Sequence, residues 1–121
     1  MYTRFGGNAR AIDLARKCLS EPEEQLEPLL IYQFKDDVAA HDDELQDHLK
    51  VEFEGEWKRA TAEIALEFGE ATVANLYDAT RYVPLNGVYG ASSWQIGKKR
   101  LFVAYAREDR ELPYLLVVGT V

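Results

Sequence analysis

Two histidines, His41 and His48, are the residues of this chain best suited to acid–base or metal chemistry, and they bracket the run Asp-Asp-Glu-Leu-Gln-Asp. On a helix, residues seven apart share a face but lie about 10–11 Å apart along the axis. Two imidazoles at that spacing cannot share a zinc ion, whose bonds to nitrogen are about 2.0–2.1 Å long. Glu44 lies between them and Glu52 follows His48 by four positions, which is the spacing of helical ion pairs. We therefore expect histidines flanked by carboxylates, with no metal and no cofactor, although a metal site completed by other helices stays open.

Acidic residues are concentrated in one stretch of the chain. The sequence has 21 Asp and Glu against 14 Lys and Arg, a net charge of −7. Residues 21–56 hold thirteen acids and two bases, a net charge of −11, so the rest of the chain is net basic. A concentrated negative field steers basic partners and raises their association rates. The alternative interpretation is a solvated helix face that keeps the protein soluble.

The leading functional hypothesis is a non-catalytic protein-binding module that docks a basic partner through residues 36–56. Four acids are expected to steer the partner and two aromatic residues to anchor it: Asp42, Asp43, Glu44 and Asp47, with Tyr32 and Trp57. Aromatic anchors within a polar rim are typical of protein interfaces. The negative net charge argues against nucleic-acid binding, which depends on Lys and Arg to neutralise phosphates.

A second group of aromatic and polar residues lies between positions 71 and 94. On loops above a sheet it could line a small-molecule pocket, with Asp78, Arg81 and Tyr82 as its polar members. This pattern supports a second hypothesis, a small enzyme or ligand-binding domain. The same aromatic residues also suit a core beneath the loops. No nucleophile elbow, phosphate-binding loop or dinucleotide fingerprint occurs in the sequence, so no catalytic residue is assigned.

The length of 121 residues suits one domain covering residues 1–121. A hydrophobic fraction of 47% with 12% aromatic residues indicates a packed core and excludes a disordered chain. The single cysteine, Cys18, excludes an internal disulfide. No apolar run approaches the roughly 18–20 residues that span a bilayer. We expect a cytoplasmic protein with no membrane association.

Helices are predicted in the N-terminal half. Five apolar residues fall on one helical stripe: Ala11, Ile12, Ala15, Cys18 and Leu19. Cys18 is therefore expected to be a small core residue rather than a reactive thiol. A further helix is predicted from Asp36 or Asp37 to about Lys50, with Val38, Leu45, Leu49 and Phe53 as its thin apolar stripe, and another over 57–68, ended by Gly69. The run 29–34 is too short to show a period, and its helix-forming neighbours favour a helix there.

Strands are predicted after Gly69. The clearest candidates are 92–96, 100–106 and 112–118, joined by a basic turn at 97–99 and a solvated charged turn at 107–111. The strand over 100–106 is apolar on both faces, which predicts helices on at least one side of it. The order of elements predicts an α+β fold, with N-terminal helices packed on a C-terminal antiparallel β-meander of three to five strands.

Three features in order, a helix ending in Phe68-Gly69, a strand containing Trp94 and the run Glu-Asp-Arg-Glu-Leu-Pro before the last strand, resemble small bacterial α+β proteins of unassigned function. The size and acidity of the chain are also similar to those of toxin-neutralising immunity proteins. That resemblance implies inhibition of a basic protein as the most concrete form of the leading hypothesis. A third hypothesis is a structural protein that oligomerises through a sheet edge or an apolar helix stripe.

Overall fold

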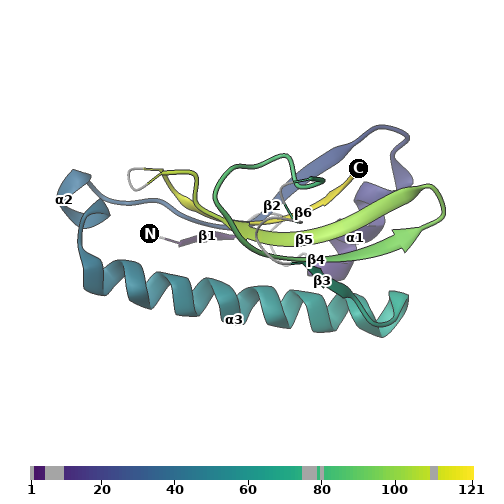
Figure 1. Ribbon diagram of the computed structural model, residues 1–121, viewed down its shortest axis with the longest axis horizontal. Coiled ribbons are helices and arrows are strands. Elements are labelled where there is room, and N and C mark those ends of the chain that lie inside the picture. The colour runs from purple at the N-terminus through teal and green to yellow at the C-terminus, as the bar shows by residue number, and fades with distance from the viewer. Residues whose placement is uncertain (1, 5–9, 75–78, 80, 110–111) are drawn as a thin grey trace.

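A six-stranded sheet with antiparallel pairing throughout lies at the centre of the protein (Figure 1). The computed structural model describes residues 2–4, 10–74, 79, 81–109 and 112–121. The strand order is β1-β2-β6-β5-β4-β3. The strands are β1 (Tyr2–Arg4), β2 (Gln25–Tyr32), β3 (Thr72–Ala74), β4 (Val88–Ile96), β5 (Lys99–Ala106) and β6 (Tyr114–Thr120). The helices are α1 (Ala11–Ser20), α2 (Asp37–Ala40) and α3 (Asp43–Phe68).

The predicted α+β fold and its C-terminal meander are confirmed. Strands β3 to β6 are neighbours both in the sequence and in the sheet, so they form a meander of four strands. The N-terminal part contributes more than helices, however. Strand β2 pairs with β6 at the far edge of the meander, and β1 pairs with β2. The sheet therefore joins segments from both ends of the sequence.

The helix predicted over residues 29–34 is wrong, because β2 occupies most of that range. Leu30 pairs with Arg4 of β1 on one side and with Leu116 of β6 on the other. The pairing shifts between Pro28 and Leu30, where β2 contains a bulge. Pairing on both sides gives hydrogen-bond partners to the backbone of an apolar run that has no helical period.

A single helix, α3, replaces the two helices predicted on either side of Gly55. Its buried residues form one stripe along its length: Gln46, Leu49, Phe53, Trp57, Ala60 and Ile64. This continuous burial outweighs the roughly 1 kcal/mol that a glycine costs inside a helix. The helix ends where predicted, at Gly69, whose φ of 87° suits a residue without Cβ. Val38 lies on the separate helix α2 and is exposed, so it is not part of the predicted apolar stripe.

Two hydrophobic cores lie on opposite faces of the sheet, as the two apolar faces of β5 predict. Helices α1 and α3 cover one face, where the core includes Leu101, Val103 and Tyr105. Residues of the connection between β3 and β4, among them Ala79 and Val83, pack on the other face against Phe102, Ala104 and Ala106. Within the described ranges, no helix has the length and apolarity that crossing a membrane requires.

Candidate functional site

Residues 36–47, which include α2 and the start of α3, form a projection that we call the acidic knob. Figure 1 places α2 at one extremity of the longest axis of the molecule. Six acidic residues of the knob are exposed: Asp36, Asp37, Asp42, Asp43, Glu44 and Asp47. The carboxylate of Asp36 accepts a hydrogen bond from the backbone N–H of Ala39 (2.8 Å), and that of Asp42 accepts one from Leu45 (3.2 Å). These two caps fix the backbone that displays the other four acids.

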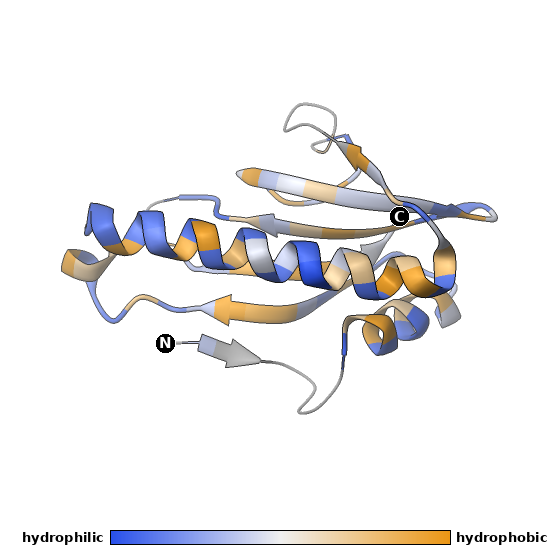
Figure 2. Ribbon diagram, turned by 90° about the horizontal axis from the view of Figure 1, so that it is seen from below, coloured by the Kyte–Doolittle hydropathy of each residue, from blue (hydrophilic) through white to orange (hydrophobic). Residues whose placement is uncertain are grey.

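The acidic knob also carries an exposed apolar residue. Val38 is 81% exposed, and Leu112, in the connection between β5 and β6, is 43% exposed. Figure 2 shows the hydrophobic colour of α2 beside the hydrophilic first turns of α3. An apolar contact residue within a charged rim is the usual arrangement of a protein interface. The knob therefore combines long-range charge with a short-range apolar contact.

Arg107 fastens the acidic knob to the sheet. Its Nη1 donates a hydrogen bond to Oε1 of Gln46, its Nη2 donates to the carbonyl oxygen of Ala40 (3.3 Å), and its Nε donates to that of Leu112 (3.4 Å). The side-chain amide of Gln46 also donates to the Ala40 oxygen (2.6 Å). One guanidinium thus joins the end of α2, the start of α3 and the connection between β5 and β6.

The burial of Arg107 corrects the prediction of a solvated turn over residues 107–111. Arg107 is only 7% exposed, whereas Glu108 and Asp109 are exposed as predicted. Its guanidinium carbon lies 4.7 Å from the ring centre of Phe34 and 5.1 Å from that of Tyr114. Aromatic faces attract a guanidinium and compensate part of its lost hydration. A run of charged residues in the sequence does not reveal which of them is buried against aromatic rings in the fold.

The two aromatic anchors expected from the sequence lie in different environments. Trp57 faces the sheet on the buried stripe of α3, and its indole N–H donates to the carbonyl oxygen of Val103 (3.1 Å). This burial removes Trp57 from the binding surface. Tyr32 is half-buried at the end of β2 and packs edge-on against Tyr2 and Phe34, with ring centres 4.8 and 5.4 Å apart. Through Phe34 it belongs to the aromatic group that surrounds Arg107.

His48 lies beside a carboxylate, as expected. The Nε2 atom of His48 is 2.7 Å from Oε1 of Glu52, four residues later. The hydroxyl of Tyr2 donates to the other oxygen of Glu52, a contact between β1 and α3 that the sequence did not indicate. Partial burial and this carboxylate raise the pKa of Tyr2. Within the described ranges, no three His, Cys, Asp or Glu side chains are grouped in a way that could hold a metal ion.

The second predicted site, in residues 71–94, is described only in part. Tyr82 packs against Phe102, with ring centres 6.0 Å apart, and the guanidinium of Arg100 lies 4.6 Å from the Tyr82 ring. Arg81 is exposed, and Asp78 lies outside the described residues. Tyr82 therefore contributes to the second hydrophobic core. The ligand pocket that these three residues would form stays a prediction.

Cys18 is buried in the core between α1 and the sheet, as the apolar stripe of α1 predicts. Its Sγ lies 3.9 Å from the carbonyl oxygen of Val118. Burial raises the pKa of the Cys18 thiol to about 11. A thiol that stays protonated at neutral pH is a poor nucleophile, so the core role of Cys18 accounts for its position.

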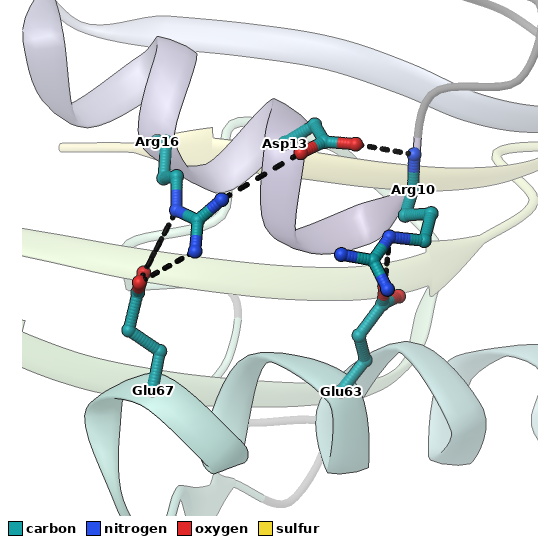
Figure 3. Close-up of polar contacts among 5 residues, drawn as sticks. All are labelled: Arg10, Asp13, Arg16, Glu63 and Glu67. Carbon is teal, nitrogen blue, oxygen red and sulfur yellow. Dashed lines mark hydrogen bonds and ion pairs between the residues drawn. The ribbon is translucent and has the colours of Figure 1, made fainter.

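Sequence reasoning missed a groove between α1 and α3, which we call the α1–α3 groove. It contains a cavity of about 260 Å³ lined by Arg10, Ala11, Leu29, Glu56, Arg59, Ala60 and Glu63. Figure 3 shows Arg10, directly before α1, and Arg16 of α1 facing glutamates of α3. The Nε atom of Arg10 lies 3.3 Å from Glu63, and Arg16 holds Glu67 through both Nε (3.2 Å) and Nη2 (2.7 Å). The regular spacing of glutamates on α3 was the only signal, since pairing between distant segments is not visible in one sequence.

No protein-family model, curated protein or solved structure matches this chain. Function is therefore inferred from the residues of the chain itself.

Proposed function

We propose that this protein is a non-catalytic protein-binding module whose acidic knob docks a basic partner, in the manner of an inhibitor or a toxin-neutralising immunity protein. The observation that carries the proposal is the exposure of Val38, at 81%, among six exposed acids on a turn held by two caps and by Arg107. The acids supply long-range attraction, which sets the association rate. Val38 supplies apolar contact area, which slows dissociation.

The acids of the acidic knob differ from those of the α1–α3 groove in their ion pairing. In the groove, Glu63 forms an ion pair with Arg10 and Glu67 forms one with Arg16. Among the described residues, no ion pair within 4.0 Å involves Glu44 or Asp47 of the knob. Their field is directed into the solvent, where a basic partner can respond to it.

Affinity capture from a lysate of the source organism tests the proposal. Three baits are compared at about 50 and 300 mM salt, over which screening rises strongly: the wild type, the triple variant Asp43→Asn, Glu44→Gln, Asp47→Asn, and Val38→Ser. The helix-capping Asp42 is kept so that α3 still starts normally. We expect a basic protein that the wild type retains at low salt, that the triple variant loses, and that Val38→Ser retains less well at both salt concentrations.

A matched control separates the acidic knob from total charge. The variant Glu23→Gln, Glu24→Gln, Glu70→Gln removes the same number of exposed acids outside the knob. We expect this control to capture the same basic protein as the wild type. If the two triple variants behave alike, or if no basic protein is captured by any bait, the acidic knob is not the binding surface.

A further inference from the structure

The α1–α3 groove contains charges of both signs above an apolar floor. Two arginines and two glutamates line its cavity: Arg10, Arg59, Glu56 and Glu63. Ala11, Leu29 and Ala60 complete the lining and are each less than 8% exposed. Glu56, Arg59 and Glu63 lie within two turns of α3, so opposite charges recur over about 10 Å.

The arginines of the cavity differ from the neighbouring Arg16 in their position and in the contacts they make. Arg16 donates hydrogen bonds to Glu67 through Nε and Nη2, and its Nη1 lies 3.8 Å from Asp13. Among the described residues, Arg10 contacts Glu63 through Nε at 3.3 Å, and Figure 3 shows one of its terminal nitrogens directed away from that carboxylate. The Nη2 atom of Arg59 lies 2.9 Å from Glu56. The contact of Arg16 with Glu67 through two nitrogens therefore lies beside this cavity, whereas Arg10 and Arg59 line it.

Exposed ion pairs such as these two can open for a ligand. The side chains of Arg10 and Arg59 are 67% and 69% exposed, and exposed ion pairs contribute little to stability. A guanidinium has five N–H donors and binds a carboxylate best through two of them. An incoming carboxylate can therefore bind a guanidinium of the lining through two contacts, and the carboxylates of Glu56 and Glu63 lie in the same lining, where an ammonium group can meet them.

We propose that the cavity of the α1–α3 groove binds a small zwitterion of the α-amino-acid class with an apolar side chain. The ligand carboxylate meets Arg10 and Arg59, its ammonium meets Glu56 and Glu63, and its side chain covers Ala11, Leu29 and Ala60. The volume of about 260 Å³ falls below the range of roughly 300–1,000 Å³ for drug-sized ligands, which favours a ligand of this size. This site lies apart from the acidic knob and does not depend on the function proposed for it.

Titration followed by heteronuclear NMR tests the proposal with leucine as the probe. Two matched analogues are titrated in the same way: N-acetyl-leucine, which lacks the ammonium group, and leucinamide, which lacks the carboxylate. We expect leucine to shift the amide signals of residues 10–12, 29 and 56–63 in a saturable way. Each analogue should bind at least tenfold more weakly than leucine. Equal binding of all three, or no saturable shift with leucine, glycine or phenylalanine, overturns the proposal.

Two variants assign the effect to the cavity. Arg59→Gln removes a lining charge from the exposed side of α3 without touching α1, and we expect it to weaken leucine binding at least tenfold while the fold is retained. Lys58→Gln is the matched control, because Lys58 is equally exposed, at 69%, pairs only with Glu54 among the described residues, and does not line the cavity. If Arg59→Gln and Lys58→Gln bind leucine alike, the arginine has no role in binding and the proposed site is wrong.

Discussion

The guanidinium of Arg107 donates to the carbonyl oxygen of Ala40, 67 positions earlier in the chain, across 3.3 Å. That oxygen belongs to the last residue of α2 and also accepts a hydrogen bond from Gln46. A short helix of four residues gains little stability from its own hydrogen bonds. Its position on the protein is therefore set by this buried contact with the end of β5.

Replacement of Arg107 should loosen the acidic knob. Arg107→Met leaves the buried oxygen of Gln46 without its donor, which costs about 1–3 kcal/mol of unfolding free energy. Urea denaturation measures this loss, and hydrogen exchange should accelerate at residues 37–46 in particular. Lys98→Met, in an exposed turn, should change stability by less than about 0.5 kcal/mol. An Arg107→Met protein with wild-type stability and wild-type exchange in the knob would show that the contact is dispensable.

Two glycines with similar backbone angles should respond differently to alanine. Gly87 and Gly97 have φ of 67° and 62°, so alanine is strained at both, by about 1–2 kcal/mol. A Cβ at Gly97 meets no atom within 4 Å, whereas one at Gly87 would lie 2.0 Å from the carbonyl oxygen of Arg107. Gly87→Ala should therefore cost about 1–3 kcal/mol more than Gly97→Ala, because the backbone at Arg107 must move. Equal losses for the two variants in urea denaturation would contradict this packing.

Cys18 should make the protein less stable at alkaline pH. The unfolded thiol ionises near pH 9.0, whereas burial raises the pKa of the folded thiol to about 11. The contribution of the protonated thiol is fully present below pH 9 and is lost as the pH rises towards 11, because only the unfolded chain releases the proton there. The difference in unfolding free energy between wild type and Cys18→Ala should therefore be constant from pH 7 to 8.5 and shift against the wild type above pH 9. A difference that stays constant up to pH 10.5 would show that the buried thiol ionises normally.

Regular alternation and helical spacing explain why much of the fold is predictable from the sequence. In β5, Leu101, Val103 and Tyr105 face the helices while Phe102, Ala104 and Ala106 face the other core, as the pattern indicates. Gly69 ends the long helix where a residue with positive φ is needed. Such signals are local, so one sequence is sufficient to detect them.

The features that escaped prediction depend on contacts between distant segments. Residues 29–34 contain no period, and only pairing with β1 and β6 determines that most of them form a strand. Arg107 occurs in a charged run, and its burial depends on Phe34, Gln46 and Tyr114. For the same reason the acids of the knob were identified from composition alone, whereas the residue that fastens the knob to the sheet was not.

The acidic knob can be tested most directly by the association rate of the captured basic protein as a function of salt. Stopped-flow or surface-binding kinetics compare the wild type with the Asp43→Asn, Glu44→Gln, Asp47→Asn variant between about 20 and 300 mM salt. Over this range the Debye length falls from about 20 Å to well below 10 Å, so long-range attraction is progressively screened. Steering by the knob predicts a wild-type rate that falls steeply with salt, and a variant rate that is lower at low salt and nearly independent of it. Equal rates with equal salt dependence for the two proteins would contradict the claim that this surface receives a basic partner.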